Sequence, residues 1–326
     1  MKSVLLEVDE LFMRFKTENG LLTAVNNVSF QVNKGETVAL VGESGCGKSV
    51  TSLSIMGLIS KQVGQVEGSI RFKGRELTRL SDKEMRALRG NELSMIFQEP
   101  MTSLNPVHTV GKQIGEVFKL HTNFSKAKQE QETVEMLKKV GIPRAEKIVR
   151  EFPHQLSGGM KQRVMIAMAM ACQPDLLIAD EPTTALDVTI QAQILELMNE
   201  LKRNSNTAIL LITHDLGVVA EMADRVMVMY YGEIVEEADV ESIFTNPKHP
   251  YTVGLLHSVP SMEEERDRLD PIKGNVPVLG EGMSGCPFLS RCNHAHEKCM
   301  QEKPPLMNVA KQRVRCWLYA SEEVAI

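Results

Sequence analysis

The sequence predicts an α/β fold in which a helical segment interrupts a series of short strands. Three observations lead to this prediction. Short apolar runs of strand length recur along the chain, at residues 37–41, 94–97, 176–181 and 208–213. Residues 42–49 form a glycine-rich loop between the first of these runs and a helical pattern over residues 50–58. From residue 99 to about residue 164 the pattern is mainly helical, so this block separates two sets of strands.

The glycine-rich loop, called the phosphate loop below, fits G-x-x-x-x-G-K-[ST] at every defined position. Its glycines let backbone N–H groups converge on phosphate oxygens, and the following helix N-terminus adds its positive end. Lys48 is expected to reach the β- and γ-phosphates of a nucleotide, and the Ser49 hydroxyl to ligate Mg²⁺. A chance Gly-Lys-Ser in a turn is the alternative, and the strand–loop–helix context argues against it. The loop sequence is Gly42-Glu43-Ser44-Gly45-Cys46-Gly47-Lys48-Ser49.

Cys46 lies in this loop, close in sequence to Lys48 and to a helix N-terminus. Both features lower the pKa of a thiol. The sequence therefore suggests a reactive thiolate, with a small filler residue as the alternative.

Length and composition limit the class of protein. The 326 residues suffice for one large domain with an appendage, or for two domains. A formal charge of −5 gives no electrostatic case for nucleic acid as the main partner. No window approaches about 18 uninterrupted apolar residues, the length of a membrane span. Six cysteines without a secretion signal indicate a reducing compartment. We expect a soluble, cytosolic chain.

The elements before the helical block are mainly strands. Residues 4–8 and 28–32 are rich in β-formers, and residues 67–73 form another short strand. Phe15 ends the first of these regions, and by residue type alone it would be an ordinary edge-packing side chain. Within the block, residues 109–121 and 125–140 are the expected helices, the second capped by Ser125.

The elements after the block deliver polar residues from helix and strand ends. Residues 157–159 begin a helix, and a helix N-terminus can bind an anion. Taken alone this signal is weak, because Ser-Gly-Gly is common in loops. Asp180 and Glu181 end an apolar strand; the first is the expected second Mg²⁺ anchor and the second could polarise a water. His214 follows the strand at 208–213, at the sheet edge where ligands bind.

These pieces together resemble the ATP-binding subunits of ABC transporters over most of residues 4–255. The resemblance implies an ABC ATPase core with a phosphate loop, an antiparallel β subdomain and an inserted helical subdomain. Two departures are mild: Lys161 where Arg or Gln is frequent, and Thr184 where Ser often stands. The motifs that carry the resemblance are residues 42–49, Gln98, Leu156-Ser157-Gly158-Gly159, Asp180-Glu181, Ala185-Leu186-Asp187 and His214.

The resemblance also implies a role for each of these positions. Phe15 would stack on adenine, and residues 42–49 would bind ATP. Gln98 would sense Mg²⁺ and the lytic water, and Asp180 would hold the metal. Glu181 would act as the general base, and His214 would contact the γ-phosphate.

The same resemblance implies a head-to-tail dimer of ATPase subunits. In such a dimer, residues that contact the partner's nucleotide or lie across the interface are Ser157, Gly158, Gly159 and Asp187. The second subunit would be a copy of this chain or a homologous ABC ATPase chain.

A narrower resemblance is to the peptide and nickel importer branch, the oligopeptide/dipeptide permease ATPases. It implies two integral membrane permease subunits, an extracytoplasmic solute-binding protein acting indirectly, and a peripheral position on the cytoplasmic face of the cell membrane. Di- or oligopeptides are the expected cargo, with nickel or another small solute as the alternative. We expect residues 98–106 to contact a permease subunit. The branch is indicated at three places: residues 98–106, residues 246–252 with Leu255, Leu256 and Pro260, and the tail from Gly285 to Cys316.

Two other classes of ABC protein fit less well. A soluble ATPase of DNA repair would carry a long heptad insertion after the phosphate loop, and a translation factor would usually carry two cassettes. Neither feature is present here. Glu181 and His214 argue against a regulatory module that does not hydrolyse ATP.

A domain boundary is expected near residues 256–262, where charged residues lead into a Pro- and Gly-containing linker. We predict an ABC nucleotide-binding domain over residues 1–258, with the helical subdomain at about 99–164. A small C-terminal domain of the peptide-importer type would occupy residues 259–326.

Four cysteines fall within 31 residues of this tail, which is too short for a sizeable core of its own. A disulfide framework is disfavoured in a reducing compartment, so the residues point to a metal centre. The spacers of five, six and sixteen residues include no close pair typical of structural zinc, whereas iron–sulfur ligands can be spread along a chain. The branch resemblance favours a [4Fe–4S] cluster, and zinc is the alternative. The expected ligands are Cys286, Cys292, Cys299 and Cys316.

Overall fold

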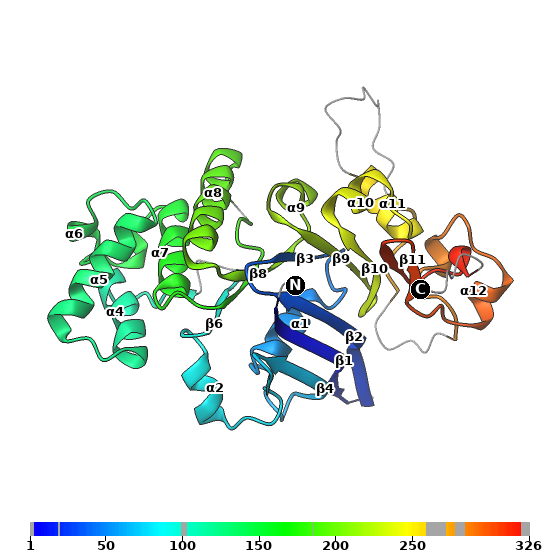
Figure 1. The fold of residues 1–326 in the computed structure, drawn as a ribbon, viewed down its shortest axis with the longest axis horizontal. Coiled ribbons are helices and arrows are strands. Elements are labelled where there is room, and N and C mark those ends of the chain that lie inside the picture. The colour runs from blue at the N-terminus through cyan, green and yellow to red at the C-terminus, as the bar shows by residue number, and fades with distance from the viewer. Residues whose placement is uncertain are drawn as a thin grey trace. The chain divides into compact units, whose positions relative to one another are not determined.

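The computed structural model describes residues 3–18, 20–98, 103–184, 186–258, 272–277 and 284–320. The chain divides into two compact units. Figure 1 shows the ribbon coloured by residue number, from blue at the N-terminus to red at the C-terminus. The first unit comprises residues 1–5, 32–36 and 79–211, and the second comprises residues 6–31, 37–78 and 212–326.

In the second unit, the central strand β3 (Thr37–Val41) leads into the phosphate loop and then into α1 (Lys48–Ile55). All five residues of β3 are buried, which explains its continuous apolar run. Its parallel neighbour is β9 (Arg225–Tyr230), and β10 (Glu233–Asp239) runs antiparallel to β9. Helices α9 (Leu216–Met222), α10 (Val240–Thr245) and α11 (Pro250–His257) belong to this unit as well.

The end of the chain extends this sheet. Strand β12 (Gln312–Val314) pairs with β10, and β11 (Met307–Val309) pairs with β12. Residues 284–320 also contain η2 (Leu289–Arg291), α12 (Glu297–Gln301) and η3 (Trp317–Tyr319). The rings of Tyr230, Tyr251 and Phe288 lie 4.6–5.5 Å apart in the core of the unit. The tail is therefore anchored in a core that it shares with the sheet.

A four-stranded sheet with the order β2-β1-β4-β5 lies mostly in the second unit. Its strands are β1 (Val4–Thr17), β2 (Gly20–Asn33), β4 (Gly64–Phe72) and β5 (Arg75–Glu76). β1 and β4 pair antiparallel, with an irregularity between Asp9 and Phe12. The first two strands are longer than predicted because they continue through residues that are only partly buried, where apolar periodicity is weak.

The first unit contains the helical block. β6 (Leu93–Ile96) and β7 (Leu176–Asp180) pair in parallel and are buried throughout, and most of β8 (Ala208–Thr213) belongs here. The predicted helices at 109–121 and 125–140 are α4 (Val110–His121) and α5 (Lys126–Lys139). Ser125 caps α5 as expected, its hydroxyl accepting from the Lys128 N–H at 3.3 Å. The other helices are α2 (Asp82–Leu88), α6 (Ala145–Ile148), η1 (Pro153–Gln155), α7 (Gly158–Met170) and α8 (Val188–Ser205).

Among the described residues, no helix combines the length and the apolar character that a membrane span requires.

Candidate functional site

The phosphate loop has a backbone that only glycine can adopt at two positions. Gly42 has φ +154° and Gly47 has φ +108°. A Cβ at Gly42 would lie 2.2 Å from the Met229 carbonyl oxygen, and one at Gly47 would lie 2.6 Å from the Ala24 carbonyl oxygen. The neighbouring strands thus press on the loop so closely that side chains are excluded. The backbone of the loop, called the cradle below, is exposed at Ser44 and Gly45, and its glycine pattern is typical of a phosphate-binding loop.

Lys48 lies inside this cradle and is 6% exposed. Its Nζ donates to the Gly42 carbonyl at 2.7 Å and to the Glu43 carbonyl at 3.0 Å. The ammonium group is therefore held against the loop backbone, where phosphate oxygens would approach. The adjacent Ser49 is half-buried in the first turn of α1.

The prediction that Cys46 is a reactive thiolate is wrong for this structure. The side chain is 1% exposed, and burial raises the pKa of the thiol even though Lys48 Nζ lies 3.8 Å from Sγ and lowers it. Desolvation outweighs the nearby positive charge, which sequence proximity alone could not reveal.

The carboxylates after β7 belong to the first unit. Asp180 is 4% exposed at the end of the strand. Glu181 follows in a left-handed backbone conformation, φ +48°, which is strained for a non-glycine residue. Its Oε2 accepts from Gln98 Nε2 at 3.0 Å and from the Thr184 hydroxyl at 2.9 Å. The structure thus brings Gln98 and Glu181 together and orients the carboxylate from two sides; Thr184, noted above only as a departure, supplies the second hydrogen bond.

The predicted partner-facing residues lie at the starts of α7 and α8. Ser157 is the N-cap of α7 and accepts from the Met160 N–H at 3.3 Å. Gly158 is exposed, and a Cβ at Gly159 would lie 2.9 Å from the Ile190 side chain. Asp187 caps α8 by accepting from the Ile190 N–H at 3.0 Å. Ile190 therefore connects the two helix starts. Ala185 lies outside the described residues.

Gln162 lies outside the sequence motifs named above. It is buried in α7, and its Nε2 donates to the Pro182 carbonyl in the loop after Glu181. The contact ties the helix that begins at Ser157 to the carboxylate loop. The sequence signal that could have found it is a Gln one turn into the helix that Ser157 opens; its burial is a result of the structure.

Two predicted nucleotide contacts lie in the second unit. Phe15 is half-buried on β1 opposite Gly64, and His214 is exposed directly after β8. Of the segment predicted to contact a permease subunit, residues 99–102 lie outside the described residues.

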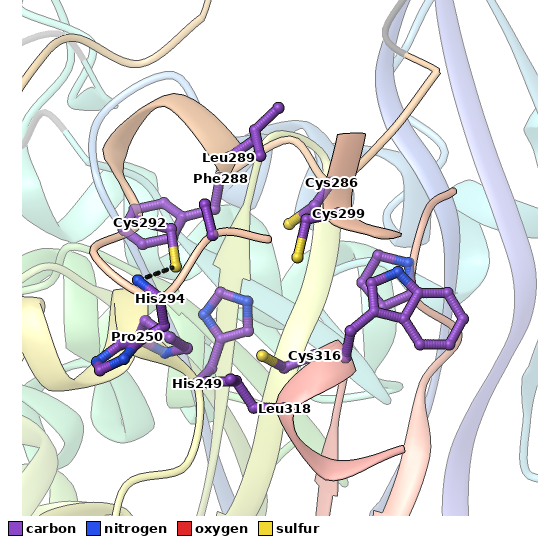
Figure 2. A pocket seen from close by; sticks show the side chains of 13 residues that line it. His249, Pro250, Cys286, Phe288, Leu289, Cys292, His294, Cys299, Cys316 and Leu318 are labelled. Atoms are coloured by element: carbon purple, nitrogen blue, oxygen red, sulfur yellow. Dashed lines mark hydrogen bonds between the residues drawn. The ribbon is translucent and has the colours of Figure 1, made fainter. Parts of the chain in front are cut away.

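Figure 2 shows the four tail cysteines around His249, a group that we call the cysteine pocket. The space that they enclose is about 10 Å³, room for a single water at most. Burial raises the pKa of the Cys286 and Cys316 thiols to about 11, so both are protonated at neutral pH.

The prediction of an iron–sulfur cluster is wrong. Among the residues that the structure describes, which include all four cysteines, no group of three or more His, Cys, Asp or Glu side chains is arranged to hold a metal ion. The zinc alternative has no support for the same reason. The pocket is instead closed by packing: Phe288 and Trp317 line it together with the thiols, and the Cys286 N–H donates to the Cys299 carbonyl at 2.8 Å.

Comparisons with known proteins agree with this geometry. A family model described as ABC transporter matches residues 25–184, and one described as oligopeptide/dipeptide transporter, C-terminal region, matches residues 235–299. The chain is 56% identical over 322 residues to the oligopeptide transport ATP-binding protein AppD of Bacillus subtilis (strain 168), with 98% of each chain covered. It is 50% identical over 320 residues to the oligopeptide transport ATP-binding protein OppD of Escherichia coli (strain K12), with 98% of this chain and 94% of that protein covered.

A similar fold is found among solved structures. The dimeric, post-hydrolysis structure of the ATP-binding cassette MJ0796 bound to ADP and Pi matches with a TM-score of 0.65 at 26% identity. The match covers 72% of this chain and 99% of that chain.

Proposed function

The chain belongs to the ATP-binding subunits of oligopeptide and dipeptide ABC transporters, and we propose that it binds and hydrolyses ATP to drive peptide import. The observation that carries the nucleotide part is the phosphate loop, where Gly42 and Gly47 let the backbone lie close against neighbouring strands and Lys48 is held against the loop carbonyls. The peptide part rests on the named relatives. The relatives named above are oligopeptide transport proteins, and they give no support to the repair, translation or nickel alternatives.

The residues fit ATP with Mg²⁺. Residues 42–49 would hold the phosphates, with Lys48 on the β- and γ-phosphates, and Phe15 would stack on adenine. Ser49 and Asp180 would hold Mg²⁺, which neutralises charge on the phosphate oxygens when bound.

The hydrolytic step would use three side chains. Glu181 accepts a proton from the attacking water, Gln98 positions that water, and His214 contacts the γ-phosphate. The hydrogen bonds from Gln98 and Thr184 support this role, because they aim a carboxylate that the left-handed backbone at Glu181 already constrains.

The assembly that we propose is a dimer of ATPase subunits that lies peripherally on the cytoplasmic face of a membrane. It would contact two integral membrane permease subunits, and an extracytoplasmic solute-binding protein would deliver peptide to those subunits. Ser157, Gly158 and Gly159 would complete the partner subunit's nucleotide site, and Asp187 would lie across the interface. The similarity to a dimeric cassette supports this arrangement. The division into a nucleotide-binding domain over 1–258, with a helical subdomain at 99–164, and a small cysteine-containing C-terminal domain over 259–326 stays a prediction.

The test is the variant Glu181→Gln in the full chain. It should bind MgATP with wild-type affinity but hydrolyse it about 10²–10⁴-fold more slowly, since only the proton acceptor is lost. The trapped nucleotide should also hold two subunits together in gel filtration. Single-turnover hydrolysis at the wild-type rate would remove Glu181 from the role of base. Asp215→Asn is a control, because this carboxylate has a structural role as the N-cap of α9.

A further inference from the structure

Two residues outside the nucleotide motifs contact the phosphate loop at Glu43. The Glu43 N–H donates to the Tyr251 hydroxyl at 2.8 Å. The Glu43 carboxylate accepts two hydrogen bonds from the Arg291 guanidinium, at 2.6 and 2.9 Å. With Lys48 on its carbonyl, Glu43 has a partner at its amide, its carbonyl and its carboxylate. The loop is thus held from the C-terminal part of the same unit.

Tyr251 is itself fixed. It is fully buried, and its ring packs on Tyr230 at 4.6 Å and on Phe288 at 5.5 Å between centroids. Its backbone N–H donates to His249 Nδ1 at 3.0 Å, and the His249 N–H donates to the buried Glu236 at 2.8 Å. The segment 246–252 therefore holds the Tyr251 hydroxyl at one position, which gives this sequence motif a physical role.

Arg291 is equally constrained. Its side chain is 3% exposed, and its guanidinium lies 5.8 Å from the centre of the Tyr230 ring and 5.9 Å from that of Phe288. Nε donates to the Lys273 carbonyl at 3.1 Å. A buried guanidinium in a two-point pair with a carboxylate is geometrically specific, and breaking the pair leaves a charge buried without compensation.

We infer that Tyr251 and Arg291 are positioning residues that hold the phosphate loop through Glu43 and thereby increase its affinity for MgATP. A loop whose amides are already oriented loses less conformational freedom when phosphates bind. The inference rests on the proposed ATPase function. It assigns a role at the nucleotide site to two residues of the C-terminal region, both of which lie outside the nucleotide motifs.

The experiment measures MgATP affinity in the full chain, by displacement of a fluorescent ATP analogue, and then KM and kcat for hydrolysis. Tyr251→Phe removes one hydroxyl and should weaken affinity about fivefold, as expected for one lost hydrogen bond. Arg291→Ala should weaken it about tenfold, because a charge-assisted pair is lost. In both variants KM should rise while kcat stays within about twofold, since the reacting groups are untouched.

Arg315→Ala is the matched control. This arginine lies in the same tail, with a side chain 13% exposed, and donates to the Ile234 and Pro304 carbonyls without contacting the loop. Its removal should lower the melting temperature and leave the affinity for MgATP unchanged. An equal loss of affinity in Arg315→Ala would show that general destabilisation, and no specific hold on the loop, is responsible.

A double variant completes the test. Because Arg291 acts through Glu43, Arg291→Ala should weaken affinity no further when Glu43→Ala is already present; additive losses would overturn the inference. Wild-type affinity for MgATP in folded Tyr251→Phe and Arg291→Ala variants would also overturn the inference. If Arg291→Ala does not fold, Tyr251→Phe decides alone. Failure of the wild-type chain to bind MgATP would instead contradict the proposed function.

Discussion

The phosphate loop and the cysteine pocket both stand out in the sequence as dense groups of reactive residue types. In the structure they differ, because backbone conformation defines the loop and side-chain packing fills the pocket. In the loop, Gly42 and Gly47 adopt conformations closed to other residues and leave a cradle around a lysine. In the pocket, four thiols converge with Phe288 and Trp317 on a space of about 10 Å³. One region has the backbone pattern of a phosphate-binding loop, and the other is filled by its own side chains.

The difference teaches where motif spacing is informative. The ligand of the phosphate loop is held by backbone amides, and a local sequence determines local backbone conformation. A thiolate site instead needs side chains from separate segments to converge with a fixed geometry and to lose their protons. Cys286, Cys292, Cys299 and Cys316 are near one another in sequence, but spacing determines neither their geometry nor their pKa values.

Lys48→Ala tests the ligand-binding side of this contrast and should have the largest effect. Loss of a buried, charge-assisted donor from the cradle should weaken MgATP binding about 100-fold, the upper end for a hydrogen bond to a charged group. Equilibrium binding in the full chain measures it. Lys83→Ala, at an exposed position in α2, should bind as the wild type does. Unchanged affinity in Lys48→Ala would mean that the cradle is no more a ligand site than the cysteine pocket.

Gly42→Ala tests whether the backbone makes the site. A methyl group 2.2 Å from the Met229 carbonyl oxygen, in a residue at φ +154°, should lower the free energy of unfolding by about 2–3 kcal/mol and weaken MgATP binding as well. Urea unfolding gives the first quantity. Gly115→Ala is the control, because this glycine is inside α4 with only an ordinary contact, and alanine there should stabilise by about 0.5–1 kcal/mol.

Acid should lower the free energy of unfolding through His249, which lines the cysteine pocket. Burial, and then Arg315, lowers the pKa of His249 to about 3. The unfolded value is about 6.5, so neutral His249 stabilises the fold above pH 6.5, and this stability is lost as pH falls from 6.5 towards 3. Between pH 6.5 and 5 the loss should be about 2 kcal/mol, from about 1.36 kcal/mol per unit. Urea unfolding of His249→Gln should show a flatter dependence on pH; an identical slope would contradict the assignment.

Replacing two pocket thiols should have the smallest effect. In a double variant, Cys286→Ser with Cys292→Ser, packing is nearly conserved and the free energy of unfolding should fall by only about 1 kcal/mol. MgATP binding should not change. Thermal and urea unfolding measure the loss. A loss of several kcal/mol would show that the tail is held by more than packing, and would remove the contrast with the phosphate loop.

Much of the fold could be predicted because local patterns were strong. The buried runs at 37–41 and 208–213 are β3 and β8, and Ser125 caps α5 as its position predicts. β1 and β2 were underestimated, since their outer halves are stabilised by pairing with neighbours and not by an apolar period.

The sequence by itself determined the phosphate loop and the family, because glycine conformations and ordered motifs are local properties of the chain. Only the tertiary structure decided the state of Cys46, where burial outweighs the nearby Lys48. It also decided that the cysteine tail is packed around His249, and that Tyr251 and Arg291 meet at Glu43, 208 and 248 residues away along the chain. Desolvation and long-range contacts depend on which distant segments pack together, and no spacing within one segment encodes that.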